Sequence, residues 1–159
     1  MDSMAKDWKY YLISIFIFLI NYLFQNYFLS VLQPSESISW AWGCYPLLSF
    51  FRGKMFFIDF GSDGFYFYIS TMAVVIVEIF LIWYMQVAIG FSRKFSIALI
   101  GGGGLCDVVG RLKYGSVIDW MVCEKFGLGP VTFNFGDFAA LLGLTMFLFH
   151  WLWKFFRGT

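Results

Sequence analysis

The stretch FYFYISTMAVVIVEIFLIWYMQVAIG, residues Phe65–Gly90, decides the fold of this chain. Glu78 is its one charged side chain. A helix needs about 20 mostly apolar residues to cross the hydrocarbon core of a bilayer, so the stretch predicts a transmembrane helix. The whole chain has the same character, because 60% of its 159 residues are hydrophobic and only 13% are charged. A water-soluble domain would have to expose much of that apolar surface, and the composition therefore favours a membrane protein.

Three further apolar segments accompany this one. We expect four transmembrane helices, at about residues 10–32, 65–90, 95–110 and 138–155. The first uncharged run, Tyr10–Ser35, is longer than the roughly 7–15 apolar residues of a secretory signal peptide. No convincing small-residue cleavage site follows it, so we predict that this run is kept as a transmembrane helix.

Two longer segments connect these helices on one side of the membrane. Residues 33–64 contain Pro34, Pro46 and alternating aromatic residues, and we predict a small β-rich cap there. We predict that residues 111–137 form a second outer loop, in which polar and apolar residues are mixed. The predicted fold is a single integral membrane domain, residues 1–159, that is all-α in the membrane and carries a small β-rich extracytoplasmic cap.

Lysines and arginines near the helix ends predict the orientation in the membrane. One side carries Lys6, Lys9, Arg93, Lys94, Lys154 and Arg157, and the other carries Arg52, Lys54, Arg111, Lys113 and Lys125. The first group forms tight clusters near both termini and in the short turn between the second and third helices. The second group is mixed with acidic residues. We therefore predict that both termini are cytoplasmic and that the two long segments face outward.

The composition also argues against several other classes of protein. A net charge of +1, without a basic stripe, gives no electrostatic basis for a nucleic-acid partner. Gly101–Gly104 lacks the lysine and the strand context of a phosphate-binding loop, so we expect close helix packing there. Cys44, Cys106 and Cys123 show no metal-ligand spacing, and we expect neither a metal nor an organic cofactor. Cys44 and Cys123 could form a disulfide outside the membrane, but we favour the interpretation as scattered small hydrophobic residues.

Asp119 and Asp137 are the residues best placed to carry chemistry. With the predicted topology both lie at the outer membrane face, one after the third helix and one at the start of the fourth. Two carboxyl groups held together share a proton, so that one can act as a base while the other is an acid. Such a pair can activate a water molecule and protonate a carbonyl oxygen. The alternative is that each aspartate only caps a helix or marks the water interface.

Three short motifs surround this pair of aspartates. They are GGGLCDVVGR at residues 102–111, GSVIDW at residues 115–120 and FNFGD at residues 133–137. In order and spacing they resemble the motifs of lipoprotein signal peptidase, the bacterial signal peptidase II. Members of that family carry a glycine-rich helix ending in an asparagine and an arginine, then a V-V-D-F segment and an F-N-x-A-D segment. The four predicted helices and the large loop between the first two are similar to that family as well.

The resemblance implies an aspartic endopeptidase of the bacterial inner membrane, with its active site at the outer face. Asp119 and Asp137 would be the catalytic pair, and Asn134 would hold that pair or the substrate backbone. Arg111 would donate hydrogen bonds to substrate carbonyl groups or fix its loop. The substrate would be a diacylglyceryl-modified prolipoprotein, cut just before its lipid-modified cysteine. We expect the protein to be a monomer. Besides the substrate, its expected partner is membrane lipid.

The sequence departs from the family pattern at four positions. Asn21 and Gln25 stand where the first helix of the family carries an aspartate and a lysine. Their role is either ordinary interhelical hydrogen bonding or the binding of substrate or lipid. Asp107 takes the place of the family's asparagine, and Gly110 that of the aspartate before the arginine. Asp107 either pairs with Arg111, one helical turn further on, or adds a third carboxylate near the catalytic pair.

These departures leave a second function open. A catalytically silent membrane protein of the same fold would bind lipidated or signal-peptide helices without cutting them. The presence of both aspartates favours the enzyme, whereas the changes at Asn21, Gln25 and Gly110 favour the silent protein.

Two further expectations concern side chains inside the predicted helices and at their ends. Glu78 is a functional candidate by its position in the membrane, but we favour a hydrogen bond to a neighbouring helix. The tryptophans near the predicted interfaces are expected to anchor the helices there; they are Trp40, Trp42, Trp120, Trp151 and Trp153.

Overall fold

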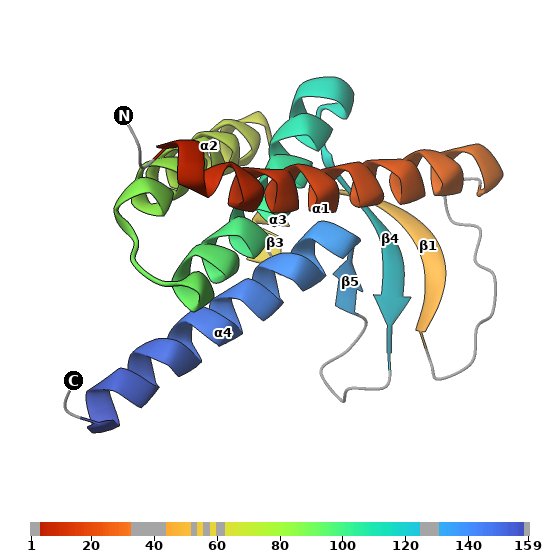
Figure 1. Ribbon diagram of the computed structural model, residues 1–159. Helices are drawn as coiled ribbons and strands as arrows, with labels where there is room; N and C mark the ends of the chain where they lie inside the picture. Colours follow the sequence, from red (N-terminus) through yellow and green to blue (C-terminus); the bar gives the residue numbers. More distant parts are fainter. Residues whose placement is uncertain are drawn as a thin grey trace.

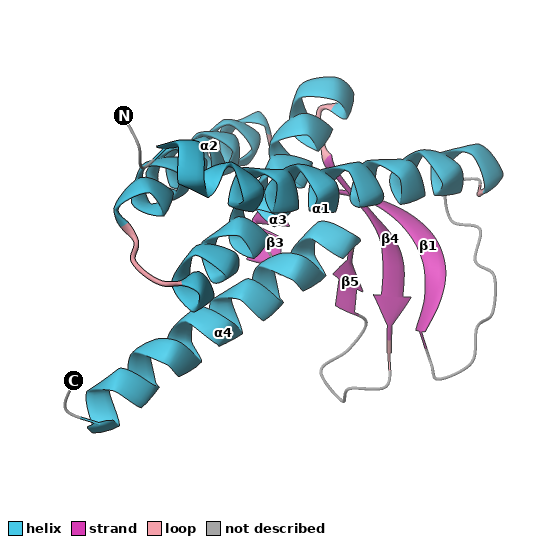
Figure 2. Ribbon diagram, viewed as in Figure 1, coloured by secondary structure: helices cyan, strands magenta, loops and turns pink. Residues whose placement is uncertain are grey.

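Four long helices and a small antiparallel sheet form the protein (Figures 1 and 2). The computed structural model describes residues 4–32, 44–51, 54–55, 58–59, 63–124 and 131–157. The helices are α1 (Met4–Val31), α2 (Gly64–Val87), α3 (Phe91–Tyr114) and α4 (Phe135–Arg157). Each is long and apolar enough to cross a membrane. The chain is a multi-pass membrane protein, as predicted.

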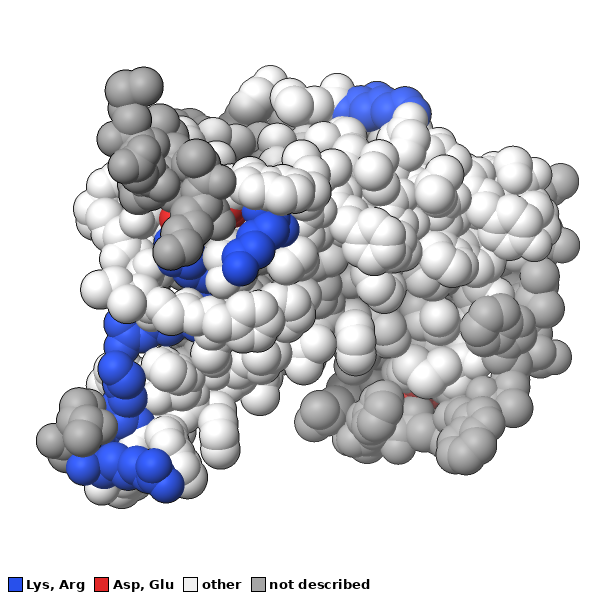
Figure 3. Space-filling view, in the orientation of Figure 1, with Lys and Arg blue, Asp and Glu red and all other residues white. Residues whose placement is uncertain are grey.

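The two ends of the molecule differ in their charge. Both termini and the connection from α2 to α3 lie at one end, and the sheet lies at the other (Figure 1). Asp7 in the first turn of α1 forms a partly buried ion pair with Lys94 in the first turn of α3, which ties the helices together at the terminal end. Lysine and arginine side chains gather toward this end, while the face beyond it is mostly uncharged (Figure 3).

α3 is the central helix of the bundle. In its membrane-spanning window 61% of the residues are buried, against 17–28% in the other three helices. Successive residues of a helix point about 100° apart, so a run of glycines removes side chains from several sides at once. A Cβ at Gly102 would lie 2.9 Å from the Cβ of Ile17 on α1, and one at Gly103 would overlap a backbone oxygen of α4. A Cβ at Gly104 would overlap the Glu78 carboxyl group of α2. The predicted packing role of these glycines is confirmed.

The sheet joins both outer segments of the chain. Its strands β1 (Cys44–Phe51), β4 (Val117–Cys123) and β5 (Val131–Phe133) are antiparallel in the order β1-β4-β5. A separate pair is formed by β2 (Lys54–Met55) and β3 (Ile58–Asp59). The prediction that residues 33–64 contain β-strands is therefore confirmed. The main strand of that segment pairs with β4 from the second outer loop, so the sheet also includes residues outside 33–64.

Cys44 and Cys123 form a disulfide between β1 and β4, where they stand opposite each other in the strand register. The interpretation of these two residues as isolated hydrophobic side chains is therefore wrong. They are 79 residues apart, and only the pairing of the two strands brings them together. Cys106 is a free cysteine, buried in α3.

The second half of α1 packs against the sheet through aromatic rings. Phe28 stacks on Trp120 with ring centroids 4.9 Å apart, and Phe24 lies 5.4 Å from the same indole ring. Trp120 is buried, so its expected role as an anchor in the membrane interface is wrong: it fixes β4 to α1 inside the protein. Trp151 and Trp153 on α4 are exposed, and Trp40 and Trp42 lie outside the described residues.

Candidate active site

The site forms where the sheet meets the N-terminus of α4. Asn134, between β5 and α4, accepts a hydrogen bond on Oδ1 from the backbone N–H of Asp137 at 3.1 Å. The backbone N–H of Asn134 in turn donates to Oδ2 of Asp137, also at 3.1 Å. This reciprocal arrangement is a capping box, and it satisfies N–H groups that have no partner within a helix. Asp137 thus has the capping role that the sequence left open as an alternative.

Asn134 also contacts the second aspartate. Its Nδ2 donates to Oδ1 of Asp119 at 3.2 Å. Asp119 lies on β4, opposite Ser49 of β1, and its side chain is fully buried. One asparagine therefore touches both carboxyl groups, one through its side-chain amide and the other through its backbone.

Asn21 links α1 to the two elements that carry the aspartates. Its Oδ1 accepts hydrogen bonds from the backbone N–H of Phe135 at 3.0 Å and from Nε1 of Trp120 at 3.4 Å. Phe135 is the first residue of α4, and Trp120 follows Asp119 on β4. Of the roles open to Asn21, hydrogen bonding between elements is the one seen here. Gln25 is buried one turn further along α1, and no hydrogen bond within the described ranges joins it to this group.

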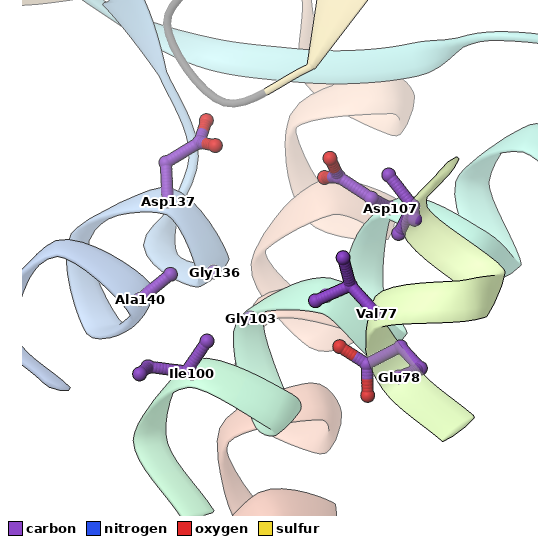
Figure 4. Close-up of a pocket in the computed structure, with 10 residues that line it drawn as sticks. Val77, Glu78, Ile100, Gly103, Asp107, Gly136, Asp137 and Ala140 are labelled. Carbon is purple, nitrogen blue, oxygen red and sulfur yellow. The ribbon is translucent and has the colours of Figure 1, made fainter. Parts of the chain in front are cut away.

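A pocket opens beside Asp137, between α2, α3 and α4 (Figure 4). Asp107 of α3 and Glu78 of α2 also line it, and glycines and aliphatic side chains form the rest of its wall. The carboxyl groups of Asp137 and Asp107 face each other across the pocket, and Glu78 lies at the opposite end from Asp137 (Figure 4). A largely apolar pocket with a few converging polar groups is typical of a site that binds a substrate.

Arg111 connects α3 to α2. Its Nη1 donates to Oγ of Ser70 at 2.7 Å and reaches Oγ1 of Thr71 at 3.5 Å. Asp107 lies one helical turn earlier, and its carboxylate acts electrostatically on the guanidinium group. Both interpretations of Asp107 therefore have support, because it lies near Arg111 and also lines the pocket with Asp137.

Sequence reasoning missed Ser70 and Thr71 as partners of the arginine. Two adjacent hydroxyl side chains in an otherwise apolar helix were the available signal. Serine and threonine are common in transmembrane helices, so the pair could not be assigned to a particular partner.

Comparison with known proteins assigns the family. The profile of the family described as Signal peptidase (SPase) II matches residues 13–153. The chain belongs to the signal peptidase II family.

Several lipoprotein signal peptidases are similar to this signal peptidase II family member. The one from Wigglesworthia glossinidia brevipalpis is 24% identical over 143 residues, which are 87% of this chain and 91% of that protein. The one from Janthinobacterium sp. (strain Marseille) is 30% identical over 105 residues, which are 65% of this chain and 63% of that protein. For the one from Ralstonia nicotianae the identity is 28%, over 64% of this chain and 60% of that protein. The match to the latter two relatives thus spans less than two thirds of their length.

Solved structures show that the fold is also shared. A bacterial membrane enzyme solved by the in meso method at 2.3 Å resolution superposes with a TM-score of 0.78 at 17% identity. That match covers 95% of this chain and 92% of the enzyme. A second such structure, at 1.9 Å resolution, gives a TM-score of 0.76 at 18% identity. The fold of these bacterial membrane enzymes therefore extends over nearly the whole chain.

Proposed function

We propose that this protein is an aspartic endopeptidase that removes signal peptides from diacylglyceryl-modified prolipoproteins. The contact of Asn134 with both Asp119 and Asp137 is the observation that carries the proposal. Two buried carboxyl groups from different parts of the chain meet at one residue, beside a pocket that opens among the helices. Membership of the signal peptidase II family and the names of the relatives support the class of substrate.

In the proposed mechanism the two carboxyl groups hold one water molecule and share one proton. The ionised group removes a proton from the water while the other protonates the oxygen of the scissile carbonyl. The resulting hydroxyl oxygen bonds to the carbonyl carbon and gives a gem-diol. The carboxyl group that took the proton of the water then gives it to the leaving nitrogen as the C–N bond breaks, and the other carboxylate recovers its proton from a hydroxyl of the diol as the new carboxyl group forms. Asn134 fixes the positions of both acids throughout, since it is bonded to each. The steps use only side chains of this chain and water.

We place the sheet and the site at the outer face of the bacterial inner membrane. Basic residues near the termini and the α2–α3 turn support a cytoplasmic position for that end (Figure 3). The disulfide between Cys44 and Cys123 supports the outward position of the sheet, because disulfides persist in oxidising compartments.

Asparagine substitutions test the proposal, since they keep the shape of each aspartate and remove its acid–base chemistry. We expect Asp119→Asn and Asp137→Asn each to lower cleavage of a purified lipid-modified prolipoprotein by at least about 100-fold. Asp63→Asn is the matched control, because Asp63 precedes α2 and makes no capping hydrogen bond with its side chain. Full cleavage by either active-site variant would reject the aspartic mechanism.

The same cleavage assay distinguishes the enzyme from a catalytically silent binding protein. Asn21 favours it, because this residue supplies a neutral oxygen for bonds between elements where the family carries an aspartate. If the unaltered protein binds a lipidated signal peptide without cutting it, while an active relative cuts it under the same conditions, the binding function replaces the enzymatic one.

A further inference from the structure

Glu78 is a buried acid that the proposed mechanism does not use. It lies within α2, and its side chain is 8% exposed. Within the part of the chain that the structure describes, no hydrogen bond involves this side chain, so the expected bond to a neighbouring helix is wrong there. Burying a carboxyl group in an apolar environment without a partner is costly.

Two pockets meet at this side chain. One contains Asp137 and Asp107, and the other lies among α1, α2 and α3, where Tyr11 and Ser14 contribute to its wall. Glu78 lines both. In the first pocket it occupies the end opposite Asp137, where it reaches into the space from α2 (Figure 4).

α3 is shaped to admit the Glu78 carboxyl group. A Cβ at Gly104 would overlap Oε1 of Glu78, and a Cβ at Gly101 would lie 3.5 Å from Oε2. Alanine at residue 104 would displace the carboxyl group. The absence of a side chain at residue 104 therefore lets Glu78 lie inside the protein instead of turning toward lipid.

We propose that Glu78 is a substrate-positioning residue that hydrogen-bonds the unwound backbone of the signal peptide on the membrane side of the cut. The inference rests on the proposed function. A peptide bond must leave its helix before it is attacked, and each freed N–H and C=O group then needs a partner within the membrane. A carboxyl group that carries its proton both donates and accepts a hydrogen bond, as the unwound backbone requires.

The composition of the pocket supports this role. The polar side chains among its lining residues are those of Asp137, Asp107 and Glu78. Asp137 is assigned to the water molecule, and the carboxyl group of Asp107 faces it across the pocket (Figure 4). Glu78 is the polar group at the other end of the pocket, on α2.

Binding to an inactive protein tests the inference separately from catalysis. In an Asp119→Asn background, we expect Glu78→Met to weaken binding of a lipid-modified signal peptide by about tenfold. Glu78→Gln keeps a donor and an acceptor, and we expect it to bind within about threefold of the parent. Gln86→Leu is the matched control, because it removes an exposed polar group from the same helix. Thermal unfolding of each variant shows whether the fold is kept.

Substrates with one backbone amide replaced by an ester separate positioning from a structural role. We would replace the amide by an ester at each of the three residues before the cut, one per substrate. We expect one of these substrates to bind more weakly than the all-amide substrate when Glu78 is present. In Glu78→Met, the same ester should have no effect on binding. A structural role would lower the affinity for every substrate alike. The inference is overturned if Glu78→Met binds as the parent does, or if no ester weakens binding to the unaltered side chain.

The two proposals fail in different ways. Cleavage by the wild type together with binding that is independent of Glu78 would reject the positioning role alone. Binding that depends on Glu78, without any cleavage by the wild type, would reject the enzymatic function alone. If Glu78→Met does not fold, the ester series on the unaltered side chain still overturns the inference when no ester weakens binding.

Discussion

Asn134 uses both ends of its side-chain amide for different purposes. Its oxygen caps α4, and its nitrogen contacts Asp119. The two functions can be separated by substitution, because aspartate keeps the capping oxygen and loses the amide donor.

We expect Asn134→Ala to lose both functions. The free energy of unfolding should fall by about 1–2 kcal/mol, the usual cost of an absent helix cap. Cleavage should fall at least tenfold. Asn134→Asp should keep most of the stability and still lose cleavage, since it places a third carboxylate beside Asp119. Denaturation curves and peptidase rates on the same preparations measure both effects; an active Asn134→Asp variant would show that the amide donor is dispensable.

Asn21 provides a second prediction at this scale. Leucine at position 21 would leave the N–H of Phe135 and the indole N–H of Trp120 without their acceptor. We expect Asn21→Leu to lower the free energy of unfolding by about 1–3 kcal/mol. Asn21→Asp keeps an acceptor of the same shape and serves as the matched control. Equal stability of the two variants in denaturation experiments would contradict the assigned role.

The capping residues could be recognised in the sequence, but their partners could not. Asn134 and Asp137 are three residues apart, so their relation is local and the motif contains it. The bonds of Asn21 to β4 and α4 span 99 and 114 residues, and that of Arg111 to Ser70 spans 41 residues. Such pairs depend on how whole elements pack, which one sequence does not show.

At the scale of the elements, hydropathy predicted the helices and missed their ends. The third helix was expected at residues 95–110 and runs from Phe91 to Tyr114. Its first and last turns carry charged residues, which were read as lying outside the span, although a helix can extend beyond the hydrocarbon core. The fourth begins at Phe135 instead of residue 138, because an aspartate in the first turn favours a helix start.

For the sheet, the strands could be predicted from the sequence but their pairing could not. Strand character could be recognised in the first outer segment, but the pairing of β1 with β4 joins segments that are far apart in sequence. Register between such strands is set by packing on both faces. The disulfide between Cys44 and Cys123 could therefore be named only as one of two possibilities.

The contact of α2 with α3 gives a prediction for these elements. In Gly104→Ala the new methyl group would overlap the Glu78 carboxyl group, and we expect a loss of about 1–3 kcal/mol in unfolding free energy. Combining it with Glu78→Ala should restore part of that stability, because the second change vacates the space. Gly64→Ala is the control, since a Cβ there would meet nothing within 4 Å. Strictly additive losses in the double variant would contradict the assigned contact.

For the whole molecule, the disulfide provides a test of both stability and orientation. We expect the Cys44→Ser, Cys123→Ser double variant to lose about 2–4 kcal/mol of unfolding free energy. Cleavage should also fall, because β4 carries Asp119.

The same cysteines report the side of the membrane. After reduction of intact spheroplasts, a membrane-impermeant maleimide should label Cys44 in the folded protein. Cys106 is buried in α3 and should stay unlabelled. Labelling that occurs only after the membrane is broken would place the sheet in the cytoplasm and reject the proposed orientation.

The long-range bonds of the site also determine when activity can arise during biosynthesis. Asn21 in the first helix holds the start of the last one, and β1 must wait for β4 to emerge from the ribosome. A nascent chain that lacks α4 lacks Asp137, so it holds no complete pair of acids. The proposed protease thus becomes active only after its final segment is inserted.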